Sequence, residues 1–177
     1  ARHKALEYYT LWDMYLELDL ANRLIQKQLG VTPVSFAYTC GQTYVGRGTQ
    51  TKSYVPLISA MFAAARTWMD NTTADPRFCD FAQLPGIELD GKSFTEIKER
   101  IEAARENGSW LILAGHEMDE GGRQTSLLST IDSICRYATD PANEIWIDNV
   151  NTVSSYLRDL RGMPRHAAMN PYENPAL

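Results

Sequence analysis

The stretch that decides the fold is "SWLILAGHEMDEGG", residues 109–122, in which an apolar run changes abruptly into polar residues. Residues 110–114 are apolar without interruption, which is typical of a strand covered on both faces in a parallel sheet. The run ends at His116, one of three histidines in the chain. We therefore expect a buried strand that brings His116 to the carboxyl edge of a sheet.

The rest of the chain alternates helical and strand patterns. We expect helices over residues 10–29, 54–68, 93–108, 125–140 and 152–162, strands over 34–38, 109–115 and 144–149, and a brief strand within 66–71. Alternation of this kind indicates crossover units and mostly parallel strands. With 177 residues, the sequence predicts one α/β domain over residues 1–163 and a loose C-terminal tail over residues 164–177.

The first helix has clear start and stop signals. Thr10 is a natural N-cap with Asp13 at the capping-box distance, and Gly30 supplies the stop. One apolar stripe comprises Leu11, Met14, Tyr15, Leu18, Ile25 and Leu29, and a second comprises Trp12, Leu16, Leu20 and Leu24. A helix with so much apolar surface is usually covered on more than one side. Either the domain itself covers both stripes, or a partner chain does, as in a homo-oligomer formed through this helix.

The helices expected over residues 93–108 and 125–140 each have an apolar face that is expected to point into the core. A second capping box joins Ser93 and Glu96. The inner face of that helix is expected to hold Phe94, Ile97, Ile101 and Ala104. The inner face of the helix over residues 125–140 is expected to hold Leu127, Leu128, Ile131, Ile134 and Cys135.

The composition argues against several classes of partner. The net charge is -5, and no cluster of Lys and Arg gives the electrostatic signature of a nucleic-acid partner. No apolar run approaches the roughly 20 residues of a membrane span, so no membrane partner is expected. Cys40, Cys79 and Cys135 lack zinc-site spacing, which favours buried or reduced thiols and leaves one disulfide as an alternative.

Polar residues follow the expected strands, and ligands of α/β proteins bind at such carboxyl ends. His116 is the catalytic candidate, and Glu117 and Asp119 are placed to orient its ring. The alternative is a packed, hydrogen-bonded histidine with no catalytic role. The acids Glu117, Asp119 and Glu120 are interpreted as a solvated turn rather than a metal cluster, so no metal ligands are assigned. Further polar positions at strand ends are Asp148 and the substrate-binding candidates Tyr38, Gly41, Gln42 and Asp70.

Three segments resemble, in order and spacing, the polysaccharide deacetylase family, also called the NodB-homology domain. They are "VTPVSFAYTCGQ" at 31–42, "SWLILAGHE" at 109–117 and "IWIDNVNTVSSYLRD" at 145–159. The resemblance implies an irregular (β/α) barrel and a hydrolase that removes acetyl groups from amides or esters on carbohydrates. It also implies a divalent metal, commonly zinc, and a general acid at the position of His116.

The chain departs from the family pattern at its metal-binding motifs. The family's T-F-D-D-G and H-S/T-x-x-H motifs are absent, and Ala37 stands where its third motif has arginine. The resemblance therefore implies the C-terminal portion of the domain, a partial barrel without metal ligands of its own, although the complete domain would bind a divalent metal. We expect a carbohydrate or other small acetylated or amide substrate, and weak or no activity in the isolated chain. The alternatives are a non-catalytic carbohydrate-binding module and a half-barrel oligomerising module.

Overall fold

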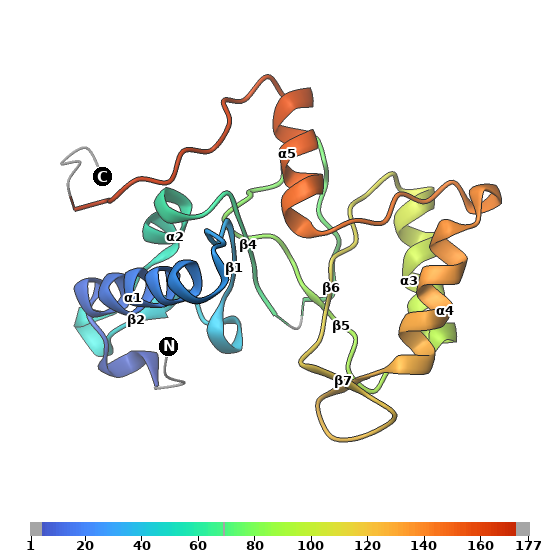
Figure 1. Cartoon of the computed structure of the whole chain (residues 1–177), viewed down its shortest axis with the longest axis horizontal. Coiled ribbons are helices and arrows are strands. Elements are labelled where there is room, and N and C mark those ends of the chain that lie inside the picture. The colour runs from blue at the N-terminus through green and yellow to red at the C-terminus, as the bar shows by residue number, and fades with distance from the viewer. Residues whose placement is uncertain (1–4, 69, 173–177) are drawn as a thin grey trace. The chain divides into compact units, whose positions relative to one another are not determined.

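The computed structural model describes residues 5–68 and 70–172 (Figure 1). Its contacts divide the chain into two compact units that interleave along the sequence. Unit 1 comprises residues 1–67, 80–84 and 154–177, and unit 2 comprises residues 68–79 and 85–153. Each unit is described below by itself.

The helices and strands of unit 1 lie in the first part of the chain. They are η1 (Leu6–Tyr8), α1 (Leu11–Leu29), β1 (Ser35–Ala37), η2 (Thr39–Gly41), β2 (Tyr44–Val45), η3 (Gly48–Gln50), β3 (Lys52–Ser53), α2 (Val55–Met61) and β4 (Ala64–Arg66), where η denotes a 3-10 helix. Unit 2 contains β5 (Ile87–Glu88), α3 (Phe94–Glu106), β6 (Leu113–Ala114), β7 (Glu117–Asp119), β8 (Thr125–Leu127), α4 (Leu128–Thr139) and η4 (Pro141–Asn143). The last helix, α5 (Val150–Leu160), begins in unit 2 and continues into unit 1.

The strands are short and pair two by two, mostly in parallel. The pairs β1–β4, β5–β6 and β7–β8 are parallel, and β2–β3 is antiparallel. This confirms a mixed α/β protein with mostly parallel strands. Over the described residues the strands form small sheets and do not close into a barrel.

The two helices with capping boxes begin where the sequence predicts. The Asp13 backbone N–H donates to Thr10 Oγ1 at 3.1 Å, and Thr10 N–H donates back to the Asp13 carboxylate at 2.9 Å. Ser93 and Glu96 make the same reciprocal pair at the start of α3. Gly30 ends α1 in the left-handed conformation, with φ of 68°. These local signals need no tertiary context to act.

The helix expected over residues 54–68 is wrong in its second half. Helix α2 ends at Met61, and Ala64–Arg66 forms β4 instead, paired in parallel with β1. Ala64 and Ala65 are almost completely buried there. Their small side chains suit a helix, but tertiary pairing with β1 overrides that local preference.

The strand expected over residues 144–149 is also absent. η4 precedes it, and Glu144 adopts a left-handed backbone with φ of 52°, which interrupts an extended run. Trp146 and Ile147 are about half exposed and belong to no described strand. Asp148 therefore does not end a strand; its carboxylate accepts from Asn149 N–H just before α5.

The inner face of α4 differs from the prediction because the helix starts three residues later. Thr125–Leu127 forms β8, and α4 then buries Thr130, Ile134 and Ala138, which are spaced four residues apart. Leu128 and Cys135 are exposed, contrary to expectation. The three cysteines are free thiols, and Cys40 and Cys135 are exposed rather than buried.

Each unit has its own apolar core. In unit 1, α1 and α2 pack around β1 and β4 through a cluster that includes Met14, Leu18, Tyr38, Tyr54, Ile58 and Phe62. In unit 2, α3 and α4 lie side by side (Figure 1) and share Ile97, Ile101 and Ile134. The unit 2 core therefore holds α3 and α4 against the residues next to β5 and β6.

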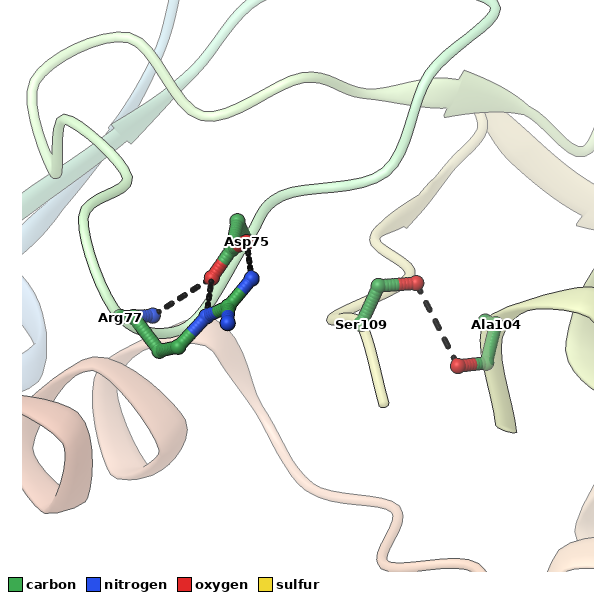
Figure 2. Close-up of polar contacts among 4 residues, drawn as sticks. All are labelled: Asp75, Arg77, Ala104 and Ser109. Carbon is green, nitrogen blue, oxygen red and sulfur yellow. Dashed lines mark hydrogen bonds and ion pairs between the residues drawn. The ribbon is translucent and has the colours of Figure 1, made fainter. Parts of the chain in front are cut away.

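Local polar contacts stabilise the segments that precede β5 and β6. The Asp75 carboxylate accepts from the Arg77 backbone N–H at 2.9 Å and from its guanidinium at 2.6 and 2.9 Å (Figure 2). The hydrogen bonds from Arg77 lower the pKa of Asp75 to about 2. Ser109 Oγ donates to the Ala104 carbonyl at 3.3 Å (Figure 2) and closes the end of α3 just before the apolar run.

The described part of the C-terminal segment makes specific contacts in unit 1. His166 Nε2 donates to the Ser59 carbonyl at 3.0 Å, and Met169 N–H donates to the Ala60 carbonyl at 2.9 Å. The Tyr172 ring packs edge-on against Trp12, with centroids 4.7 Å apart. Residues 164–172, expected to be loose, thus contact α1 and α2, and residues 173–177 lie outside the described residues.

Candidate functional site

The candidate site forms where two parallel strands of unit 2 end. In the β5–β6 pair, Ile87 lies opposite Leu113 and Glu88 lies opposite Ala114. The same register carried two residues further sets Asp90 opposite His116. The carboxyl ends of paired parallel strands lie at one edge, so the two side chains meet there.

Asp90 holds both the ring and the backbone of His116. One carboxylate oxygen, Oδ2, lies 2.5 Å from His116 Nδ1. The other, Oδ1, accepts from the His116 backbone N–H at 3.1 Å and from Ser126 Oγ at 2.8 Å. Ser126 comes from β8, so three segments of unit 2 converge on one carboxylate.

The two members of this pair differ in exposure. The Asp90 side chain is 5% exposed, whereas that of His116 is 47% exposed. Burial alone would raise the pKa of Asp90, but the hydrogen bonds from His116 and Ser126 outweigh it and hold that pKa below its usual value. Asp90 is therefore a buried carboxylate at neutral pH, with a solvent-accessible imidazole in front of it.

The charge on Asp90 fixes which ring nitrogen of His116 carries a proton. An ionised carboxylate only accepts hydrogen bonds, so Nδ1 must be the donor. Nε2 is then the nitrogen free to exchange a proton with another molecule. The Trp68 ring packs against the imidazole at 75°, with centroids 4.8 Å apart, and limits its rotation.

Gly115 makes the close approach of these segments feasible. A Cβ atom at this position would overlap Ser126 Oγ and would lie 2.8 Å from Asp90 Oδ1. Any side chain at residue 115 would therefore push Ser126 or Asp90 away from the site. The glycine before His116 in "LAGHE" is explained by this packing.

The set Asp90, His116 and Ser126 contains the residue types of a serine hydrolase but not its arrangement. Ser126 is 3% exposed, and its hydroxyl donates to Asp90 rather than pointing to the imidazole as a nucleophile would. Ser126 therefore orients the carboxylate. The arrangement can donate or accept a proton at His116 Nε2.

The structure separates the other candidate residues by unit. Asp70 is in unit 2; its carboxylate accepts from Gly86 N–H at 3.0 Å, and it lines a polar hollow of about 400 Å³ with Glu88, Lys92 and Arg100. Tyr38, Gly41 and Gln42 are in unit 1.

Within unit 1, Tyr38 and its neighbours serve the local structure. Tyr38 is 2% exposed, and its hydroxyl donates to the Ala82 carbonyl at 2.8 Å, so this ring lies in the core. Gly41 adopts a left-handed backbone, and the Gln42 carbonyl accepts from the Tyr54 hydroxyl. We propose no substrate contact for Tyr38.

Three residues of the site were missed by sequence reasoning. Asp90 follows a strand of only two residues, in a region where no helix or strand was expected, and Ser126 was assigned to a helix. Trp68 was assigned to the end of the second helix. The one usable signal was the alternation of Ile87, Glu88 and Leu89 directly before Asp90, which is typical of a short strand.

The acids after His116 are solvated, but Glu117 and Asp119 lie in a strand rather than a turn, and Glu120 follows that strand in a bend. Glu117–Asp119 is β7, exposed throughout and paired in parallel with β8. Over residues 5–68 and 70–172, no group of three or more His, Cys, Asp or Glu side chains is close enough to hold a metal ion. The described residues therefore do not fit the zinc site that the family resemblance implies for a complete domain. None of the described helices is both long and apolar enough to cross a membrane.

Comparison with protein families, with curated proteins and with solved structures finds no match for this chain. The resemblance to polysaccharide deacetylases thus rests on the short segments quoted above, and what it implies about activity is a proposal.

Proposed function

We propose that unit 2 carries the proton-transfer half of a carbohydrate deacetylase centre, in which His116 donates a proton to the leaving amine or alcohol of an acetylated sugar. The observation that carries this proposal is the 2.5 Å contact between His116 Nδ1 and the buried Asp90 carboxylate. With it we propose that the parallel strand pairs belong to a partial, irregular (β/α) barrel of the polysaccharide deacetylase type.

The geometry supports general acid catalysis more than a purely structural histidine. A structural histidine usually has both ring nitrogens engaged inside the protein, whereas this ring is 47% exposed and is held on its Nδ1 side. Asp90 fixes the tautomer, and its negative charge compensates the positive charge on the ring whenever Nε2 is protonated. Nε2 can then pass that proton to a leaving group that it contacts directly.

General acid help supplies only part of the acceleration that deacetylation needs. A positioned acid contributes about 10²–10⁴-fold, and the water must still be activated and the acetyl carbonyl polarised. The described residues assign no group to these two tasks. We therefore propose that this chain alone deacetylates its substrate slowly, and that replacing His116 lowers this residual rate of deacetylation.

A test combines acetate release with ligand binding. We would measure single-turnover acetate release from N-acetylated chitooligosaccharides with protein in excess, with and without added Zn²⁺, and follow the His116 ring by NMR during titration with the same sugar. His116→Gln should lower the residual rate by roughly 10²-fold. The sugar should shift the His116 ring signals.

The matched control is His166→Gln, because His166 is the other histidine among residues 5–68 and 70–172 and contacts the Ser59 carbonyl in unit 1. It should leave rate and binding unchanged. Equal acetate release in His116→Gln and the unchanged protein would contradict the catalytic role. A sugar-dependent shift at His116 without any acetate release would favour the non-catalytic carbohydrate-binding alternative.

A further inference from the structure

Helix α1 exposes an apolar stripe that the core of unit 1 does not use. The α1 stripe consists of residues four apart, Trp12, Leu16, Leu20 and Leu24, which are 49%, 44%, 52% and 42% exposed. The opposite face of the helix buries Met14 and Leu18 in the core. The core therefore leaves the second of the two stripes seen in the sequence uncovered.

The exposed surface continues beyond the stripe. Ile25 and Leu29 are also exposed, and every residue from 23 to 32 is exposed. Tyr172 contacts the stripe at Trp12. Contiguous apolar surface beyond a few hundred Å² is uncommon on monomeric proteins and marks interaction sites.

The charges along α1 are arranged so that two copies of the helix in antiparallel orientation complement each other. Its N-terminal half carries Asp13, Glu17 and Asp19, and its C-terminal half carries Arg23 and Lys27. Two copies in antiparallel orientation would place the acidic half of each against the basic half of the other. Antiparallel helix dipoles also attract, whereas a parallel pair would bring like charges together. Arg23 pairs with Asp19 of its own helix at the surface, where an ion pair contributes little and can be exchanged for another.

One register satisfies the apolar positions and pairs Asp13 with Arg23, although it also sets Glu17 level with Asp19 of the second copy. Residues 12 and 24, residues 16 and 20, and residues 13 and 23 are all centred on Leu18. A twofold axis on the exposed face of α1, level with residue 18, would set Trp12 against Leu24 of the second copy and Leu16 against its Leu20. The same axis puts Asp13 level with Arg23 of the second copy.

A hollow beside the stripe fits such a basic side chain. It has a volume of about 370 Å³, with Leu16, Leu20, Tyr8 and Tyr9 giving an apolar lining and Asp13 and Glu17 supplying carboxylates. An arginine combines an aliphatic stem with a charged guanidinium. The stem of Arg23 of the second copy suits the apolar lining of the hollow, and its guanidinium suits the two carboxylates.

We propose that the α1 stripe is a homodimer interface, in which a second copy of this chain binds through its own α1 in antiparallel orientation about a twofold axis level with residue 18. A twofold interface requires one surface to complement itself, and the shared centre of the apolar and charged pairs meets this requirement. An unrelated partner would need no such centre. This proposal is independent of the proposed activity of His116.

The first experiment measures mass in solution. Sedimentation velocity and light scattering between about 1 and 200 µM should show a dimer, with Kd in the micromolar range or below. Leu16→Glu with Leu20→Glu should weaken association at least 100-fold. Ile147→Glu, which changes an exposed apolar residue of unit 2, should not weaken it. A monomer at about 200 µM, or a dimer unaffected by the α1 changes, would overturn the proposal.

The second experiment tests the charge pairing. Arg23→Glu should weaken self-association at least tenfold, as should Asp13→Lys. A mixture of the two variants should form a heterodimer, because the lysine introduced in one chain then faces the glutamate introduced in the other. Asp13 also caps α1, so circular dichroism must show the helix intact. Failure of the mixture to associate, with both variants folded, would rule out this register.

The third experiment tests orientation. A spin label at Leu29→Cys, with the three native cysteines changed to Ser, lies 11 residues from the proposed centre. The two labels of an antiparallel dimer should then be separated along the helix axis by roughly 33 Å, at 1.5 Å per residue. A distance near 10 Å would mean a parallel pair and would contradict the antiparallel proposal.

Discussion

His116 donates both its ring Nδ1–H and its backbone N–H to the carboxylate of Asp90, so one buried acid sets the position and the protonation pattern of the ring. Asp90 acts through His116 and is a positioning residue. Its effect on the ring can be measured without any substrate.

Asp90→Asn should change the tautomer of His116. An amide side chain can donate as well as accept, so Nδ1 would no longer be the obligatory donor. Long-range ¹⁵N–¹H NMR should show one dominant neutral tautomer, protonated at Nδ1, in the unchanged protein and a mixture in the variant. Asp70→Asn serves as the control. An unchanged ring spectrum in Asp90→Asn would show that the carboxylate does not control the ring.

Asp90 should also contribute stability that depends on pH. Its pKa is lower in the folded protein than its usual value of 3.8, so its contribution is present above about pH 4 and is lost as the pH falls toward the folded pKa. The difference in urea midpoint between the unchanged protein and Asp90→Asn should therefore be larger at pH 7 than at pH 3. A difference that grows on acidification would give the opposite sign and refute this assignment.

Gly115→Ala should destabilise unit 2 and disturb the site. The added methyl group would overlap Ser126 Oγ, and relieving such a clash costs about 1–3 kcal/mol in a packed region. Urea unfolding measures the loss. Gly121→Ala is the control, since a Cβ there meets no atom within 4 Å. Equal stability of the two variants would mean that the loop before His116 adjusts freely.

Thr125 and Thr130 should respond in opposite directions to the same substitution. Thr125 is 1% exposed, and its hydroxyl finds no hydrogen-bond partner among the described residues. Thr125→Val should therefore stabilise the protein by about 1 kcal/mol.

Thr130 provides the matched comparison, because its buried hydroxyl donates to the Lys92 carbonyl at 2.8 Å. Thr130→Val should destabilise by about 1–2 kcal/mol, since it leaves that carbonyl without its donor. Chemical unfolding of both variants decides the matter. A loss of stability in Thr125→Val would indicate that its hydroxyl has a partner after all.

The sequence predicted those parts of the fold that depend on neighbouring residues. The capping boxes at Thr10 and Ser93 and the stop at Gly30 lie where expected, because the interacting groups are three or four residues apart or depend on one backbone conformation. A strand end shortly before His116 was also predicted, but the strand expected over residues 109–115 is reduced to the two residues of β6.

Features set by distant residues could not be predicted in this way. Ala64 and Ala65 join β4 only because β1 lies beside them. Asp90 meets His116 across 26 residues of sequence, and β5 is too short to show any periodicity. The acids expected to orient His116, Glu117 and Asp119, were chosen because they are close in sequence, whereas the fold supplies Asp90 instead.

The interleaving of the two units affects how the protein should respond to a protease. Unit 1 contains segments from both sides of unit 2 in the sequence: the chain leaves unit 1 at Trp68 and returns to it at Ser154. A single cut in the exposed segment 120–123 would give two bands on a denaturing gel. The fragments would nevertheless stay together in native buffer, because Arg158 donates to the Ala63 carbonyl at 2.8 Å and its guanidinium packs over Phe81. Co-elution of two such fragments would therefore reflect a single nicked molecule rather than two separately folding domains.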